Sequence, residues 1–172
     1  EYAFAANYGY HLDAGAFAQL LTQHGVEQLG VRHHLLDIKE TVLSQSGLIE
    51  ALITESGERL QADLYIDCSG SSALMLGRAL GTPLIDQSHI LFNNAALAVQ
   101  VPHLTEDAPI ASSTRSTAVA GGWIWDIALS HRRGIGYVHA TDFVDETEAE
   151  QTLRSYIARE FNGAVAKAIA PR

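Results

Sequence analysis

The sequence is poor in cysteine, in basic residues and in long apolar runs. Its one cysteine, Cys68, excludes an internal disulfide, and a single thiol suits the reducing cytosol. Eleven basic against twenty acidic residues give a formal net charge of −9, which disfavours nucleic-acid binding. No run of about 18 apolar residues is present, and residues 1–20 lack the plan of a signal peptide. We therefore expect a cytoplasmic protein with neither a nucleic-acid partner nor a membrane association.

The motifs of metal binding and of nucleophilic catalysis are also missing. His33 and His34 are adjacent, so on a strand they would point to opposite faces, and no Cys/His cluster exists; we expect no metal site. Ser69 lacks the glycine that a nucleophile elbow needs two positions earlier, because Asp67 stands there. No G-x-G-x-x-G is present, so any dinucleotide would need a phosphate loop from outside these residues.

What is present is enough to fold. The 172 residues are 47% apolar, which allows a real hydrophobic core without disulfide or metal staples. The only methionine is Met75, in the interior of the sequence, and the chain opens at Glu1. We expect a piece of a longer polypeptide.

The first half predicts a helix followed by a β-meander. Asp13 is a good N-cap, and apolar residues at helical spacing follow it, which predicts a helix over about 13–29. Three runs with strand character come next, separated by two four-residue turns that contain glycine, at residues 31–43, 48–54 and 59–68.

The third run changes character at its end. Residues 64–68 are almost all apolar, as in a strand covered on both faces, and a turn of small residues then leads into a predicted helix at 73–80. Small residues alone can explain such a turn. Alternatively, a turn of this kind at the carboxyl end of a strand lets the backbone approach a bound nucleotide or flavin.

The second half predicts strands and a final helix. The expected strands are 90–101, 118–129 and 135–140, and the connection 102–117 is long for a hairpin, as functional loops often are. Asp145 and Glu148 form a capping box before an apolar stripe, which predicts a helix over about 146–161.

The most unusual segment is W-I-W-D-I at residues 123–127. On a strand, Trp123, Trp125 and Ile127 share one face, and these are the only two tryptophans of the chain. Large aromatic side chains usually pack in cores, so a core face is one interpretation. The other is a broad and rigid apolar wall built from two indoles.

This segment resembles the W-x-W-x-I-P motif of the flavin-dependent tryptophan halogenases. A-D-L-Y-I-D-C-S-G at residues 62–70 resembles the strand A-D-L-F-I-D-C-S-G of that family, and the spacing between the two motifs matches. The segments 10–14, 91–102 and 134–138 look like family segments in the same order, so the resemblance covers nearly the whole chain as a middle section of a longer protein. One departure is Ala128, which replaces the motif's proline and puts the substrate class in question.

The resemblance implies an α/β fold with mixed sheets. It comprises part of an FAD-binding module similar to the flavin monooxygenases related to p-hydroxybenzoate hydroxylase, and an antiparallel sheet that covers the substrate. The expected division is a partial FAD-binding module, a substrate-side sheet with the W-x-W motif, and a C-terminal helix with a tail, at residues 1–86, 87–145 and 146–172.

The resemblance also implies a reaction and its partners. Reduced FAD, supplied by a separate flavin reductase, and oxygen convert a halide into hypohalous acid, which passes through a channel to an indole-type substrate, often in antibiotic biosynthesis. The family's lysine and glutamate that direct the halogen have no counterpart here, so no catalytic residue is expected in this chain and we expect it to be inert alone. A homodimer is left open.

Site residues follow position by position from the same resemblance. The residues that match the flavin-contacting positions are Ile38, Cys68, Ser69 and Gly70. The residues that match the passage between flavin and substrate are Trp123, Trp125 and Ile127.

Two other functions stay open at this point. The first is a flavin-dependent aromatic hydroxylase, which uses the same scaffold. A lysine in the family context upstream of these residues would favour halogenation, and its absence would favour the hydroxylase. A truncated, non-catalytic binding module is the third interpretation, and a natural gene that encodes only this stretch, without an upstream G-x-G-x-x-G, would favour it.

Overall fold

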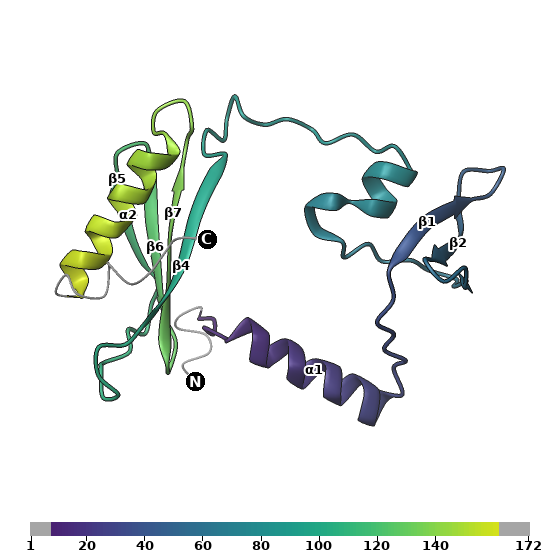
Figure 1. The fold of residues 1–172 in the computed structure, drawn as a ribbon, viewed down its shortest axis with the longest axis horizontal. Coiled ribbons are helices and arrows are strands. Elements are labelled where there is room, and N and C mark those ends of the chain that lie inside the picture. Colours follow the sequence, from purple (N-terminus) through teal and green to yellow (C-terminus); the bar gives the residue numbers. More distant parts are fainter. Residues whose placement is uncertain (1–7, 162–172) are drawn as a thin grey trace. The chain divides into compact units, whose positions relative to one another are not determined.

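The computed structural model describes residues 8–161, which divide into two compact units (Figure 1). The meander unit consists of residues 21–86, and the sheet unit consists of the described residues up to 20 together with those from 87 onward. The helix α1, Ala14–Leu29, begins after Asp13, whose carboxylate accepts hydrogen bonds from the backbone N–H groups of Gly15 and Ala16 at 3.0 and 3.1 Å. The helix predicted after this N-cap is confirmed.

The meander unit contains the expected antiparallel sheet. Its strands pair in the order β1-β2-β3, with bounds Ile38–Leu43, Ile49–Thr54 and Arg59–Leu60. The two connecting turns are closed by backbone hydrogen bonds from Gly47 to Ser44 and from Gly57 to Thr54, at 2.9 and 3.0 Å. The β-meander prediction is therefore confirmed in its topology.

Two of the predicted strands are shorter than expected. Residues 31–37 and 61–68 form no strand, and Leu64 and Ile66 are 76% and 75% exposed rather than covered on both faces. A strand exists only where a neighbour completes its backbone hydrogen bonds, and no described residue pairs with this segment. The prediction of a covered strand at 64–68 is therefore wrong for the described residues.

The predicted helix at 73–80 is present in an unusual form. A 3₁₀ turn at Gly70–Ser72 leads into a π-helix at Leu74–Ala79, and Ala73 between them has a φ of 41°. A left-handed alanine is rare, and π-helical turns are frequent at functional sites. The geometry of this turn therefore differs from a simple strand-to-helix connection.

The sheet unit is an antiparallel sheet with one long helix against it (Figure 1). The strands pair in the order β4-β7-β6-β5, with bounds Ala95–Pro102 for β4, Arg115–Val119 for β5, Gly122–Ala128 for β6 and Arg132–His139 for β7. The single strand predicted at 118–129 is wrong, because the chain reverses after Val119. Gly121 has a φ of 69°, which a turn of two residues between β5 and β6 requires here.

The helix α2, Glu146–Glu160, supplies the core of this unit. Asp145 caps it by accepting the N–H of Glu148 at 2.8 Å, as the capping-box pattern predicts. Its apolar stripe packs with inward residues of the sheet in one cluster that contains Val99, Val101, Ile124, Ile135, Tyr137, Leu153, Tyr156, Ile157 and Phe161. One face of the sheet is therefore sealed by α2.

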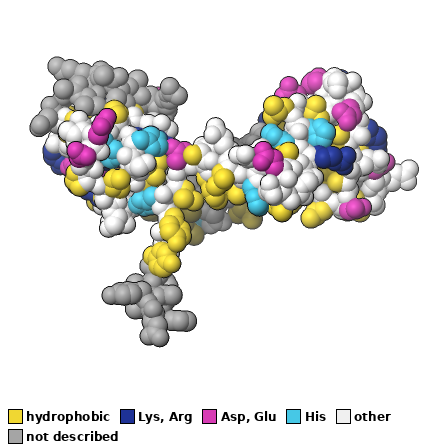
Figure 2. All heavy atoms as spheres, turned by 90° about the horizontal axis from the view of Figure 1, so that it is seen from below, with side chains coloured by type: hydrophobic (Ala, Val, Ile, Leu, Met, Phe, Trp, Pro, Cys, Tyr) yellow, Lys and Arg dark blue, Asp and Glu magenta, His cyan; other side chains and the backbone are white. Residues whose placement is uncertain are grey.

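Large apolar side chains also remain on the surface of both units, and Figure 2 shows hydrophobic side chains spread over the visible face of the molecule. None of the helices in the described part of the chain is long and apolar enough to span a bilayer.

Candidate functional site

The face of the sheet away from α2 carries the two tryptophans. Along β6, Ile124, Asp126 and Ala128 are buried toward the helix, so the alternating side chains of Trp123, Trp125 and Ile127 lie on the opposite face. We call this the indole face. The structure thus brings together the three residues that the motif singled out.

The two indoles form one rigid pair. The ring centroids of Trp123 and Trp125 are 6.2 Å apart with an interplanar angle of 60°, an edge-to-face arrangement that aromatic pairs favour. Trp123 is 38% exposed, and Trp125 and Ile127 are half-buried. Within the described residues the two rings are therefore neither sealed in a core nor fully exposed.

Small residues surround the pair. The cross-strand neighbours of Trp125 are Ser116 on β5 and Gly136 on β7, and Ala98 on β4 follows Gly136 in the same row. Ala118 pairs with Trp123 in the next row. Because these side chains are short, they leave room for the indole rings next to the strands.

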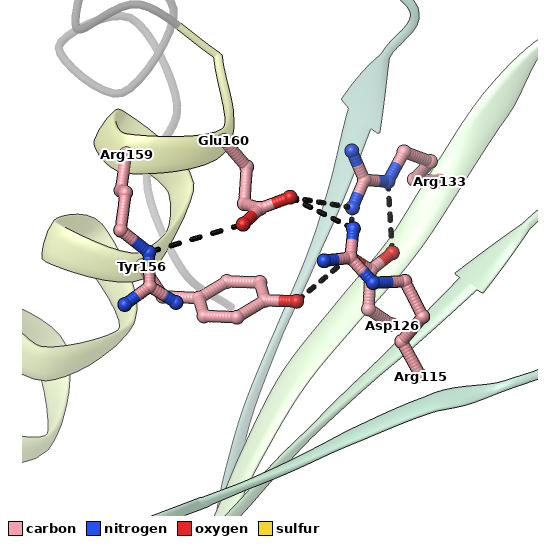
Figure 3. Close-up of polar contacts among 6 residues, drawn as sticks. All are labelled: Arg115, Asp126, Arg133, Tyr156, Arg159 and Glu160. Carbon is pink, nitrogen blue, oxygen red and sulfur yellow. Dashed lines mark hydrogen bonds and ion pairs between the residues drawn. The ribbon is translucent and has the colours of Figure 1, made fainter. Parts of the chain in front are cut away.

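The opposite face of β6 carries a buried polar network that the sequence did not predict. Asp126, with 2% of its surface exposed, pairs through both carboxylate oxygens with Arg133 on β7 (Figure 3). The hydroxyl of Tyr156 on α2 donates to the same carboxylate at 3.0 Å, and Arg133 also lies over the Phe161 ring at 4.5 Å. Desolvation lowers the pKa of Arg133. This network ties β6, β7 and α2 together directly beneath the indole face.

A signal for this network was present in the sequence. An aspartate inside an otherwise apolar strand needs a partner. Arg133, on the strand after the next turn, is opposite Ala128 and therefore diagonal to Asp126 on the same face of the sheet. Two further ion pairs extend the network toward the surface: Arg115 contacts Glu160 at 2.8 Å, and Glu160 lies 3.9 Å from Arg133 (Figure 3).

The turn that follows residue 66 is organised by one carboxylate. Asp67 accepts hydrogen bonds from the hydroxyl and the N–H of Ser69 through one oxygen, and from the N–H groups of Met75 and Leu76 through the other. The Ser69 hydroxyl in turn accepts from the N–H of Leu74 at 2.9 Å. The Ser69 hydroxyl, followed by these backbone donors, holds the pKa of Asp67 well below its ordinary value.

The remaining flavin-matching residues are placed as follows. Cys68 and Gly70 are exposed in the same turn as the half-buried Ser69, and Ile38 opens β1, paired with Thr54. The structure therefore gathers three of the four residues into one turn and puts the fourth in the same unit. The indole face lies in the other unit.

Two cavities share Ala111 and Ala128, the last residue of β6, in their linings. One, of about 730 Å³, is lined by the segment 8–13 and by residues 110–113 and 128–130, and His11 contacts Thr114 at its edge at 3.1 Å. The other, of about 240 Å³, is lined by His103, Asp126, Arg133 and Phe161 among others. In the described part of the chain no three His, Cys, Asp or Glu side chains gather in a way that could hold a metal ion.

Comparison with known proteins decides the family. The family model described as tryptophan halogenase matches residues 2–168. The chain belongs to the tryptophan halogenase family. It has the mixed α/β fold of those proteins, with two antiparallel sheets.

Individual relatives agree. The chain is 39% identical over 150 residues to a 7-chloro-L-tryptophan 6-halogenase of Kutzneria sp. (strain 744), a match that covers 87% of this chain and 29% of the relative. Among solved structures, a tryptophan halogenase from Shewanella frigidimarina NCIMB 400 superimposes with a TM-score of 0.89 at 44% identity, covering 96% of this chain and 31% of that one. A flavin-dependent tryptophan C-6 halogenase from taromycin biosynthesis gives 0.84 at 35% identity, covering 94% and 30%. The chain therefore spans about 30% of the length of these proteins.

Proposed function

We propose that the protein is a flavin-dependent halogenase that uses reduced FAD, oxygen and a halide to halogenate tryptophan or a related indole. The observation that carries the proposal is the W-I-W-D-I strand of a tryptophan halogenase family member, with both indoles on the sheet face that α2 leaves uncovered. In this proposal the chain supplies part of the flavin site and the wall between flavin and substrate. The groups that direct the halogen come from the rest of the protein.

The turn at residues 67–70 fits a flat cofactor. Nothing lies within 4 Å of the position that a Cβ on Gly70 would take, and its φ of 64° is one that glycine adopts without strain. Cys68 is exposed beside it, whereas Asp67 is fully engaged with backbone donors. The turn can therefore present bare backbone to a flavin while Asp67 keeps its shape.

The cofactor supplies the oxidising chemistry that turns a halide into an electrophilic halogen. The residues of this chain exclude water and separate the reactants. Trp123, Trp125 and Ile127 offer a dry apolar surface, and each indole has only two side-chain torsions, so the wall is stiff. A wall of this kind keeps the flavin from transferring oxygen directly to the ring and confines the small oxidant on its way to the substrate.

Partners of the reaction follow from the same chemistry. The proposal requires a flavin reductase to supply reduced FAD, a halide ion and an aromatic substrate with an indole ring. A cytoplasmic location agrees with the single cysteine, Cys68.

Incubation of the full-length protein that carries this sequence tests the proposal. The mixture contains a flavin reductase, NADH, FAD, tryptophan and either chloride or bromide, and the product is examined by mass spectrometry. The proposal predicts the mass gain and isotope pattern of one halogen, absent when either halide or FAD is omitted. A gain of one oxygen would assign the protein to the aromatic hydroxylases, and an unchanged substrate in all arms would contradict both enzyme functions.

A further inference from the structure

The glycine at position 136 lies directly under an indole ring. Gly136 on β7 is the cross-strand partner of Trp125. A Cβ added to Gly136 would overlap the Cζ2 and Cη2 atoms of the Trp125 ring and would lie 2.6 Å from its Cε2 atom. Real Cβ atoms do not approach other atoms so closely, so the benzo half of the indole occupies the space where every other residue type has its side chain.

The backbone conformation at position 136 does not require a glycine. Gly136 has no left-handed φ, so its conformation is open to any residue. A glycine inside a strand weakens it, because the residue has high conformational freedom when unfolded and no side chain to pack. Glycine at this position therefore destabilises the strand, and the structural feature that accounts for it is the space that the Trp125 ring occupies.

A second glycine on the same strand and the same face gives a contrast. Gly134 pairs with Ile127, two residues along from Trp125. A Cβ there would meet nothing closer than the guanidinium of Arg132 at 3.8 Å, which is ordinary contact with the end of a flexible side chain. The overlap with an indole thus belongs to Gly136 and not to every glycine of β7.

We propose that Gly136 is a positioning residue that seats the Trp125 indole flat on the sheet. With the ring on Gly136, and with Ala98 beyond it in the same row, the indole stays low and leaves the space above the face open. A side chain at position 136 lifts the ring into that space or turns it away from Trp123. This inference rests on the proposed function, in which that space is the path between flavin and substrate.

The test compares Gly136→Ala with Gly134→Ala in the full-length protein. The first readout is the near-ultraviolet circular dichroism of the Trp123–Trp125 pair, recorded as a difference from the same variant that also carries Trp125→Phe. The second is the fraction of reduced flavin that ends in halogenated product rather than in hydrogen peroxide. We expect Gly136→Ala to change the tryptophan signal and to lower this fraction several-fold, and Gly134→Ala to change neither.

A double variant guards against a simple loss of folding. Because phenylalanine lacks the fused ring, Gly136→Ala combined with Trp125→Phe removes the collision, so the yield of folded protein recovers if the collision is the cause. An unchanged dichroism signal in folded Gly136→Ala would contradict the proposal that Gly136 positions the Trp125 ring. A changed signal with unchanged coupling overturns its role in the reaction. A wild-type protein that makes no halogenated product contradicts the proposed function instead, and with it the functional half of this inference.

Discussion

The two faces of the β4–β7 sheet differ in what they bury. The face under α2 contains fully buried side chains such as Ile124, Ile135 and Tyr137, together with the ion pair of Asp126. The indole face, on the same strands, has small residues and a tryptophan that is 38% exposed. Side chains on one strand alternate between the faces, so β6 contributes to both. The comparison indicates that the face under α2 forms the packed core of the sheet, whereas the indole face keeps partly exposed aromatic side chains.

The largest expected effect comes from breaking the buried ion pair. Asp126→Ala leaves the guanidinium of Arg133 desolvated and without its bidentate partner, which costs roughly 3–5 kcal/mol of unfolding free energy. Urea unfolding of the 172-residue chain followed by far-ultraviolet circular dichroism measures the change.

The control is a surface ion pair that also joins an arginine to a carboxylate. Arg59→Ala removes a contact at 2.8 Å with Glu50 in which both side chains are over 40% exposed, so we expect a loss of about 1 kcal/mol or less. Equal losses for Asp126→Ala and Arg59→Ala would show that the network beneath the indole face does not hold the sheet.

The next effect compares apolar truncations on the two faces. Leu153→Ala creates a cavity between α2 and the sheet and should cost about 3 kcal/mol. Val138→Ala, on the half-buried indole face, should cost about 1 kcal/mol or less, because little packed surface is lost. The midpoints of urea unfolding give both values. A larger loss for Val138→Ala would mean that the indole face is covered in solution.

A smaller and local effect is expected in the meander unit, which lacks a sealed face of this kind. Asp67 has a lowered pKa, so its charged form stabilises the turn above the ordinary carboxyl value of 3.8, and this stabilisation is lost as the pH falls through the lowered pKa. At pH 7, Asp67→Ala should reduce hydrogen-exchange protection of the Met75 and Leu76 amides, whose N–H groups bond to this carboxylate. The neighbouring variant Cys68→Ser should leave both amides protected.

The pH dependence gives the contradicting outcome for Asp67. The difference between wild type and Asp67→Ala should be constant from pH 7 down to about 4 and should shrink only in stronger acid. Equal protection of the two amides at pH 7, or a difference that disappears near pH 6, would show that the carboxylate does not organise the turn.

The sequence predicted the elements whose signals are local. Asp145 with Glu148, and Asp13 before an apolar stripe, mark the starts of α2 and α1 because the capping side chain and the helix lie within a few residues of each other. The placement of Trp123 and Trp125 on one face also followed from strand alternation alone. The family, including its two motifs, was predicted from residues that the comparisons then matched.

Features that depend on distant partners were not predictable in the same way. The strand expected at 64–68 needs neighbours that the described residues do not provide, so Leu64 and Ile66 are exposed. The turn at Gly121 divides a run that looked continuous, since its apolar alternation passes through the turn. The role of Gly136 required knowing that Trp125 lies across from it, which depends on the register of β6 and β7.

The release of hydrogen peroxide by a Trp125→Ala variant of the full-length protein tests the central claim most directly, that the indoles separate flavin from substrate. The matched control is Phe143→Ala, an aromatic residue of the same unit that is 72% exposed. We predict that Trp125→Ala releases several-fold more peroxide per reduced flavin and forms correspondingly less halogenated product, while Phe143→Ala behaves as wild type. Wild-type coupling in Trp125→Ala would contradict the account.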